Sequence, residues 1–276
     1  MSTSAVVPRL PGMTPEELET AGLQYVVDGA VATITLHRPD VRNAQTPTMW
    51  RTLARLGEGI PEDVRVVVVR GANGIFSAGL DRRLLMPGGS DGQESVADLL
   101  VADDATMSAT IDAYQQGFTW LMDPRFVSIA VVEGYAIGAG FQLALACDLR
   151  VAAEESFFCM KEAALGLVPD LTGTKPLVEA VGYARALEIC ATARNVPAEE
   201  AAAIGLVLST VPGTELDATV DALVTALTAP LPGAVRETTA LLKGAAERTL
   251  DDQRRLEREA QTRRFREMAA LMGAQA

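Results

Sequence analysis

Two glycine-rich segments carry the residues of this sequence whose types and spacing suit chemistry. The first, GANGIFSAGLD, covers residues 71–81, and the second, EGYAIGAGFQLALACD, covers residues 133–148. In the second, residues 138–140 (GAG) open the apolar run 141–146, so the first N–H groups of a predicted helix have no acceptor within that helix. One such donor from each segment would form an oxyanion hole for an enolate, and small residues let a ligand approach the backbone.

Other interpretations of these segments are a nucleotide-binding loop, tight packing and a catalytic triad. The second segment has Leu143 where a dinucleotide-binding fingerprint needs its third glycine, and no GxxxxGK[ST] loop occurs in the sequence. Taken singly, each segment also fits tight packing of a strand on a helix. The single histidine, His37, would have to serve any Ser-His-Asp triad, and no GxSxG elbow occurs. A serine protease would need Ser77 as nucleophile and His37 as base.

Predicted strands lead into both segments. The β-branched runs Val64–Val69 and Val127–Val132 are typical of strands that are covered on both faces. Asp28-Gly29 lies between the β-rich runs 25–27 and 31–36 and predicts a tight hairpin. The remaining predicted elements are helices over 48–58 and 105–122 and a strand over 149–152. These recurring strand–turn–helix units predict an α/β fold with a parallel sheet.

The chain is predicted to have three regions. Residues 1–21 form an N-terminal arm, in which the cap, proline and early acids of TPEE start a short helix. Residues 22–213 form the α/β core, and helix formers dominate residues 214–276. The charged helix within that last region is either a solvated face, a subunit contact or a cationic surface for a phosphate-bearing ligand. The glycine-rich, acidic stretch Pro87–Asp104 is predicted to be a mobile loop of the kind that acts as a lid.

Composition and charge exclude several classes of function. The 276 residues are 49% apolar and 22% charged, which predicts a folded chain with a sizeable core. The net charge of -12 has the wrong sign for a nucleic-acid-binding protein. Three cysteines without metal-ligand spacing fit reduced thiols and no metal site. The sequence shows neither an export signal nor a membrane-spanning run, so we expect a cytoplasmic protein that does not bind membranes.

Four motifs, taken in order, resemble the crotonase, or enoyl-CoA hydratase/isomerase, superfamily over about Val26 to Ala203. They are HRPDVRNA (37–44), FSAGLD (76–81), EGYAIGAGFQLALACDLRVAA (133–153) and FFCMKEAALGLVPDLTGT (157–174). The resemblance implies a crotonase-like spiral of ββα units with a C-terminal helical trimerisation region, assembled as a homotrimer or homohexamer. It also implies an acyl-CoA thioester substrate, a role in fatty acid metabolism, and no cofactor other than the coenzyme A of the substrate.

The resemblance also assigns the site residues. The thioester oxygen is expected at the N–H groups of Ala78 and Ala139, and Asp81 is expected beside the pocket for adenine and pantetheine. The position of the first hydratase glutamate is Gln142, which borders the substrate together with Gly138. The position of the second glutamate is Glu162.

Gln142 favours an isomerase over a hydratase. A glutamine cannot exchange a proton near neutral pH, so the two-carboxylate activation of water that hydration requires is incomplete. A single carboxylate at Glu162 suffices for moving a double bond. The string from Lys161 to Asp170 resembles dienoyl-CoA isomerases, and Gly166 and Pro169 prevent a regular helix there, so Asp170 could reach the same cavity. The alternatives are an enoyl-CoA hydratase with an atypical second catalytic residue and a non-catalytic acyl-CoA-binding protein.

Overall fold

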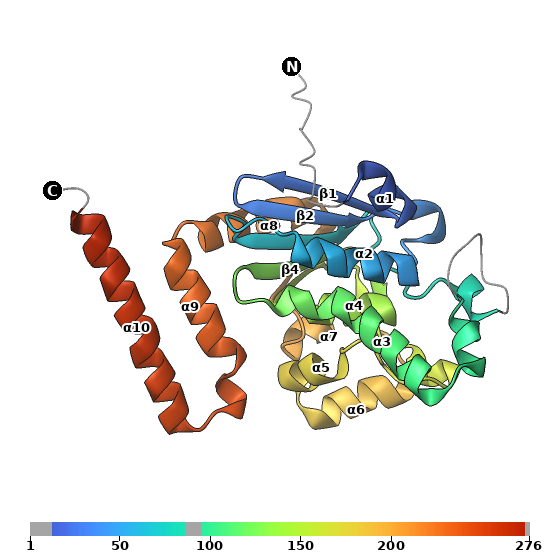
Figure 1. The fold of residues 1–276 in the computed structure, drawn as a ribbon. Coiled ribbons are helices and arrows are strands. Elements are labelled where there is room, and N and C mark those ends of the chain that lie inside the picture. Colours follow the sequence, from blue (N-terminus) through green and yellow to red (C-terminus); the bar gives the residue numbers. More distant parts are fainter. Residues whose placement is uncertain (1–12, 87–94, 274–276) are drawn as a thin grey trace, which may run out of the picture.

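The computed structural model describes residues 13–86 and 95–273 and contains two sheets (Figure 1). The larger sheet has six strands in the order β1-β2-β3-β4-β6-β9, and the smaller has the order β5-β7-β8. The strands are β1 Leu23–Asp28, β2 Val31–Leu36, β3 Val66–Gly71, β4 Val127–Val132, β5 Tyr135–Ile137, β6 Leu149–Ala153, β7 Phe157–Cys159, β8 Val196–Pro197 and β9 Ser209–Val211.

Helices alternate with these strands and then form the whole C-terminal region. The α-helices are α1 Pro15–Thr20, α2 Pro47–Glu58, α3 Asp104–Thr119, α4 Ala139–Ala146, α5 Thr174–Val181, α6 Tyr183–Thr192, α7 Ala198–Ala203, α8 Leu216–Thr228, α9 Pro232–Lys243 and α10 Leu250–Gly273. The predicted α/β class, with a helical C-terminal region, is confirmed.

The larger sheet begins with a hairpin and continues as parallel strands. β1 and β2 pair antiparallel across Gly29, whose φ of +54° suits the tight turn that Asp28-Gly29 predicts. From β2 to β9 every pairing is parallel. Because the carboxyl ends of parallel strands lie at one edge of a sheet, the segments that follow β3 and β4 emerge side by side.

Both faces of the larger sheet are covered, which explains its continuous β-branched strands. In β3, Val67 and Val69 join the core that α2, α3 and α4 share, whereas Val66 and Val68 pack with residues of α8. Successive side chains of a strand point to opposite faces, so a strand between two helical layers needs apolar residues at every position. All six residues of β4 are buried for the same reason.

The predicted loop Pro87–Asp104 and the predicted N-terminal arm lie only partly within the described residues. The stretch Pro87–Asp104, predicted as a loop, holds a 3-10 helix over Val96–Val101, and Ser95 caps that helix and is buried. Residues 87–94 lie outside the described residues, as do residues 1–12 of the predicted N-terminal arm. The short helix predicted in the arm is confirmed as α1, which Thr14 and Glu17 cap reciprocally.

The last two helices stand beside the core (Figure 1). α9 and α10 contact each other, with Arg263 of α10 paired with Glu237 of α9, and Lys243 at the end of α9 forms an ion pair with Asp148 of the core. Among the described helices, none alone is long and apolar enough to cross a membrane. The bent pair Gly213–Thr228 and Pro232–Glu247 meets that length and composition only when its two parts, 101° apart, are taken together.

Candidate active site

The two glycine-rich segments lie against each other through backbone hydrogen bonds. Phe76 and Ser77 donate their N–H groups to the carbonyls of Glu133 and Tyr135, and the Ile137 N–H donates back to the Ser77 carbonyl at 3.0 Å. A methyl group on Gly79 would lie 2.5 Å from the Ile137 carbonyl oxygen and 3.5 Å from the Ala139 nitrogen. The two predicted turns therefore meet at Gly79, and no larger residue fits there.

The amides that remain available at this meeting point are those of Leu80 and Ala139. Neither N–H has a hydrogen-bond acceptor among residues 13–86 and 95–273. The N–H of Ala78, which the sequence predicts as the first donor, instead donates to the Arg42 carbonyl at 3.0 Å. Ala78 therefore does not offer a free amide, whereas Leu80, two residues further along the chain, does. Ala139 has the predicted free amide, because it is the first residue of α4.

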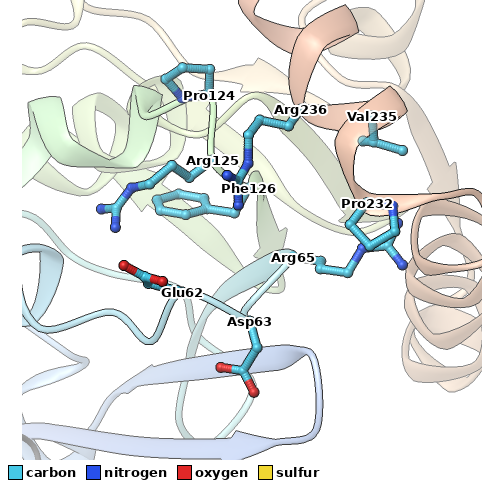
Figure 2. Close-up of a pocket in the computed structure, with 9 residues that line it drawn as sticks. All are labelled: Glu62, Asp63, Arg65, Pro124, Arg125, Phe126, Pro232, Val235 and Arg236. Atoms are coloured by element: carbon cyan, nitrogen blue, oxygen red, sulfur yellow. The ribbon is translucent and has the colours of Figure 1, made fainter. Parts of the chain in front are cut away.

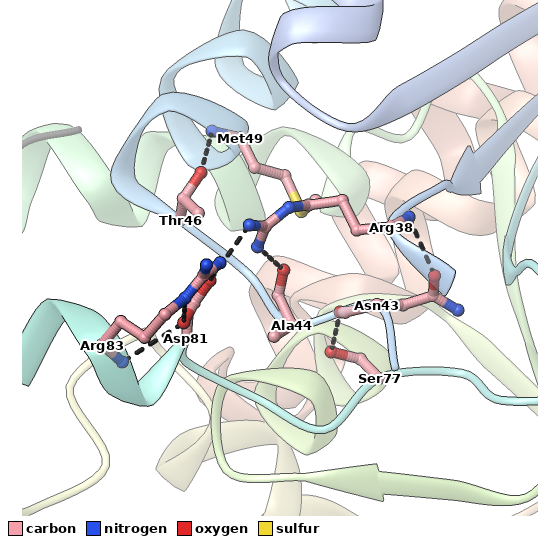
Figure 3. A network of polar contacts seen from close by, with 8 residues as sticks. All are labelled: Arg38, Asn43, Ala44, Thr46, Met49, Ser77, Asp81 and Arg83. Carbon is pink, nitrogen blue, oxygen red and sulfur yellow. Dashed lines mark hydrogen bonds and ion pairs between the residues drawn. The ribbon is translucent and has the colours of Figure 1, made fainter. Parts of the chain in front are cut away.

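A buried polar network fixes the first turn. Ser77 is fully buried, and its hydroxyl donates to the Asn43 carbonyl at 2.8 Å (Figure 3). The same hydroxyl accepts from the Gly79 N–H and from Nε2 of Gln45. Gln45 in turn accepts from the indole N–H of Trp50 at 2.8 Å. These bonds occupy the Ser77 hydroxyl. Within the described residues, no hydrogen bond joins Ser77 to His37, which is exposed. The serine-protease interpretation is therefore wrong.

Asp81 is enclosed by arginines rather than open to a ligand. Its side chain is 5% exposed and pairs with Arg83 at 2.7 Å and with Arg38 at 3.0 Å (Figure 3). The hydrogen bonds from Arg83, with those from Arg38, lower the pKa of Asp81 to about 2. Arg38 also donates to the Ala44 carbonyl at 2.5 Å. The carboxylate thus ties the end of the first turn to the segment after β2, and its predicted contact with coenzyme A stays a prediction.

Glu162 lies beside the start of α4, where Ala139 presents its amide. A methyl group on Gly138 would be 3.3 Å from Oε1 of Glu162, so the carboxylate borders the second turn. Oε1 accepts a hydrogen bond from Nε2 of Gln142 at 2.7 Å, and the buried Oε2 has no partner in the described chain. Burial raises the pKa of Glu162, and the charge of Asp170 raises it further against the opposing Gln142 hydrogen bond. A poorly solvated carboxylate with one unpartnered oxygen is suited to accept a proton.

Gln142 is held in one orientation by backbone amides. Its Oε1 accepts from the Leu171 N–H at 2.8 Å and from the Gly173 N–H at 3.3 Å, which directs its NH₂ group towards Glu162. The residue is fully buried in α4. Since both lone pairs of the amide oxygen are occupied and the nitrogen has none to offer, Gln142 cannot accept a proton from water.

Asp170 is half-buried after the 3-10 helix Glu162–Leu165, which ends at Gly166 in a left-handed conformation. The predicted interruption of the helix is confirmed. Burial raises the pKa of Asp170, and Nε2 of Gln115 donates to its backbone carbonyl at 2.7 Å. Gln115 belongs to α3 and lines a hollow of about 370 Å³ together with Met107 and Ile111. Asp170 therefore lies close to both the buried Glu162 and the face of α3 that carries Gln115.

A second hollow, of about 150 Å³, lies between the start of β3, the segment before β4 and α9 (Figure 2). It contains neither of the free amides nor Glu162. The guanidinium of Arg65, which lines it, donates to the carbonyls of Thr228, Leu227 and Pro230 at the end of α8. This hollow is a junction of structural elements and lies outside the candidate site.

Sequence reasoning missed the roles of Leu80, Gln45 and Leu171. Leu80 follows the glycine whose close approach defines the site, and the alternation of inward and outward amides in an extended segment was the signal that could have identified it. The contacts of Gln45 and Leu171 join residues far apart in the chain, and nothing in the local sequence indicates them.

Comparison with known proteins agrees with this geometry. The sequence profile of the enoyl-CoA hydratase/isomerase family matches residues 27–276. A Thermobifida fusca YX protein solved in complex with CoA is 48% identical, with a TM-score of 0.90 over 95% of this chain and 100% of that chain. A second structure from that organism, in complex with acetoacetyl-CoA, is 50% identical, with a TM-score of 0.89 over 92% of this chain and 98% of that chain.

Curated relatives carry two kinds of name. The "Probable enoyl-CoA hydratase echA8" of Mycobacterium bovis is 32% identical over 68% of this chain and 68% of its own length. The mitochondrial Delta(3,5)-Delta(2,4)-dienoyl-CoA isomerase of Homo sapiens is 34% identical over 74% of this chain and 63% of its own length. The fold, the two joined turns and these matches lead to one conclusion. The chain has the crotonase fold and belongs to the enoyl-CoA hydratase/isomerase family.

Proposed function

We propose that this protein moves the double bond of an enoyl- or dienoyl-CoA thioester through an enolate. The observation that carries the proposal is the contact between Gln142 and Glu162: one carboxylate capable of proton transfer faces one amide that is locked as a donor. The acyl-CoA class of substrate is supported by the family and by structural neighbours that hold CoA and acetoacetyl-CoA.

In this proposal the amides of Leu80 and Ala139 bind the thioester oxygen. Leu80 replaces Ala78 as the first donor because the Ala78 N–H already donates to the backbone carbonyl of Arg42. Two N–H donors stabilise the negative charge that the oxygen gains when a proton leaves the acyl chain, and this acidifies the adjacent carbon. Glu162 Oε2 takes a proton from one carbon, the electron pair of that C–H bond becomes part of the enolate, and the same proton returns to another carbon.

Asp170 is the proposed second proton carrier for dienoyl substrates. Its charge raises the pKa of Glu162, which supports a position near that carboxyl group. With a longer conjugated system, one carboxyl group removes a proton near the thioester while the other donates one further along the chain. A monoenoyl substrate needs Glu162 alone.

Assays on three thioesters test the proposal: a 3-enoyl-CoA, a 3,5-dienoyl-CoA and a 2-enoyl-CoA. We expect bond migration in the first two and little hydration of the third. Glu162→Gln should lower isomerisation by about 10²–10⁴-fold while thioester binding stays intact, and the exposed Glu154→Gln serves as the matched control. Vigorous hydration of the 2-enoyl substrate without migration overturns the proposal in favour of a hydratase. Thioester binding with no turnover of any substrate identifies a non-catalytic binding protein.

The proposal extends to assembly as a homotrimer or homohexamer. Only Ala260 of α10 is buried, whereas several large apolar side chains of that helix are exposed. These are Leu250, Phe265, Met268, Leu271 and Met272. Sedimentation velocity should give a multiple of three subunits, and Phe265→Glu should dissociate it. A monomeric species at micromolar concentration would contradict this part.

Two further parts of the proposal concern cofactor and location. We expect full activity after treatment with a chelator and without added nucleotide, because the chemistry requires only amides, carboxyl groups and the coenzyme A thioester itself. We also expect a cytoplasmic location. Cell fractionation tests the location, and activity that depends on an added metal would contradict the first expectation.

A further inference from the structure

The two free amides of the candidate site differ in what lies behind them. Ala139 opens α4, so the aligned peptide dipoles of that helix strengthen its N–H as a donor to negative charge. Leu80 belongs to none of the described helices. Its N–H therefore has the strength of one ordinary amide unless another group polarises it. The contacts on the far side of the Leu80 peptide group supply such a group.

The carbonyl of Gly79 sets the direction of the Leu80 N–H, because both belong to one peptide group. In a trans peptide group the carbonyl and the N–H point in opposite directions, and none of the described peptide bonds is cis. The Gly79 carbonyl accepts from the Gln45 N–H at 2.7 Å, and the next amide, that of Asp81, donates to the Gln45 carbonyl at 2.9 Å. Gln45 thus holds the peptide groups on both sides of Leu80, and the Leu80 N–H points away from Gln45.

The same relationship is repeated one peptide group further from the site. The Gln45 N–H shares its peptide group with the Ala44 carbonyl, which accepts from Nη1 of Arg38 at 2.5 Å (Figure 3). Two peptide groups therefore stand in series between a guanidinium and the site, each with its N–H end towards the site. The hydrogen bonds of this chain run from Arg38 to Ala44 and from Gln45 to Gly79, and its last N–H is that of Leu80.

Such a chain increases the donor strength of its last N–H. A carbonyl that accepts a hydrogen bond polarises its own peptide group, which makes the N–H of that group a stronger donor. A charged donor at the start of the chain forms a bond roughly twice as strong as a neutral donor does. The Arg38 side chain is 20% exposed and Gln45 is fully buried, so water screens the effect of the charge little along this path.

The surroundings of Arg38 fix its guanidinium and leave it positive. Nη2 pairs with Oδ2 of Asp81 at 3.0 Å while Nη1 faces the Ala44 carbonyl. The stem packs on Gly22, since a methyl group on that glycine would lie 2.3 Å from Cγ of Arg38. Arg83 pairs with the same carboxylate at 2.7 Å. Because two arginines share one carboxylate, a net positive charge remains beside the start of the chain.

We propose that Arg38 is a positioning residue of the oxyanion hole, which polarises the Leu80 amide through two peptide groups and thereby stabilises the enolate more than the bound thioester. A polarised N–H gains most against a full negative charge, so the effect grows as the proton leaves the acyl chain. The guanidinium acts through the amide, so it should change turnover rather than acyl-CoA affinity. This inference rests on the proposed function, since it assumes that the thioester oxygen binds at Leu80.

Acetoacetyl-CoA tests the inference, because its enolate shares its negative charge with the thioester oxygen. A pH titration of the bound compound, followed by the ultraviolet absorbance of the enolate, gives its acid dissociation constant. Arg38→Met keeps the stem on Gly22 and removes the guanidinium. It should lower this constant about tenfold, a fraction of the roughly 10²–10³-fold effect of losing a whole donor. The kcat for a 3-enoyl-CoA should fall by a similar factor, while the Kd of butyryl-CoA changes less than about twofold.

Two further variants separate the chain of hydrogen bonds from charge and folding. Arg83→Met is the matched control, because it also takes an arginine from Asp81. Both methionine variants should lower the melting temperature, but Arg83→Met should leave the constant and kcat near those of the wild type. Arg38→Gln keeps a neutral donor on the same stem, which protects the fold. It should lower the constant less than Arg38→Met does.

Equal shifts in Arg38→Met and Arg83→Met overturn the inference, because they show a general loss of positive charge. An unchanged constant in a folded Arg38→Met or Arg38→Gln overturns it too, and so does an equal loss of butyryl-CoA affinity and kcat. The proposed function stands in all these cases. Failure of the wild-type protein to bind acetoacetyl-CoA or to turn over any thioester overturns the proposed function, and this inference with it.

Discussion

The side-chain N–H of Gln142 donates to Oε1 of Glu162 at 2.7 Å, and this contact distinguishes the site from a pair of carboxylates. It partners one oxygen of the glutamate and leaves the other, Oε2, buried without a partner. The glutamine itself is held by two backbone amides and has no freedom to reverse. One proton carrier of defined orientation is the result, and the predictions below follow from it and from the turns that it faces.

The stability of Glu162→Gln should depend on pH. Burial raises the pKa of Glu162 above its ordinary 4.5, so the folded state holds the carboxyl proton more strongly than the unfolded state. The wild type therefore loses stability as pH rises from 4.5 through the raised pKa of the folded state. The substitution removes the buried charge. We therefore expect Glu162→Gln to melt at a higher temperature than the wild type at pH 8. The two proteins should converge below pH 4.5, and a gap that widens towards low pH would contradict the assignment.

Gln142→Glu should introduce hydration. The new carboxylate can keep the amide hydrogen bonds from Leu171 and Gly173, and it places a second acid beside Glu162. Two adjacent carboxyl groups share a proton and can activate water between them. Measured on a 2-enoyl-CoA, hydration should rise above the wild-type rate, while isomerisation of a 3-enoyl-CoA changes less. Gln142→Ala, which supplies no acid, is the control and should gain no hydration.

Gly79→Ala should abolish acyl-CoA turnover. The added methyl group would lie 2.5 Å from the Ile137 carbonyl oxygen, and the φ of Gly79 is +84°, so the two turns must move apart and their amides can no longer share one oxygen. We expect a loss of about 10²–10³-fold in kcat, as for removal of an oxyanion-hole donor. Gly182→Ala is the matched control, because Gly182 has a φ of +77° but open space around it. Equal activity in both variants would refute the arrangement of the turns.

Asp81→Asn should destabilise the protein without directly changing proton transfer. The fall of the Asp81 pKa from an ordinary 3.8 to about 2 corresponds to roughly 2 kcal/mol of folding stability. This stabilisation is present in the wild type above pH 3.8 and is lost as pH falls towards 2. Urea unfolding at pH 7 should show about this loss. Asp217→Asn, whose ion pair with Arg70 is exposed, should lose less than about 0.5 kcal/mol. A loss at pH 7 no larger than that of Asp217→Asn would contradict the role of Asp81.

Local pattern was sufficient for most elements of the fold. The hairpin at Asp28-Gly29, the buried strand Val127–Val132 and the helix that opens at Ala139 each depend on neighbouring residues, through turn chemistry, burial on both faces and unsatisfied first-turn amides. The 3-10 helix Val96–Val101 was missed because the glycine-rich, acidic sequence around it resembles a loop. Its position depends on the burial of Ser95 against Leu84 and Met86.

The sequence by itself determined the α/β class, the two glycine-rich turns and the identity of the ionisable groups, because composition and periodicity are properties of the chain alone. Only the tertiary structure decided which amide faces outward at Gly79, that the Arg42 carbonyl occupies the Ala78 N–H, and that Leu171 and Gly173 hold Gln142. Each of these depends on contacts between residues distant in the chain, and such contacts exist only after the strands have paired and brought the segments together.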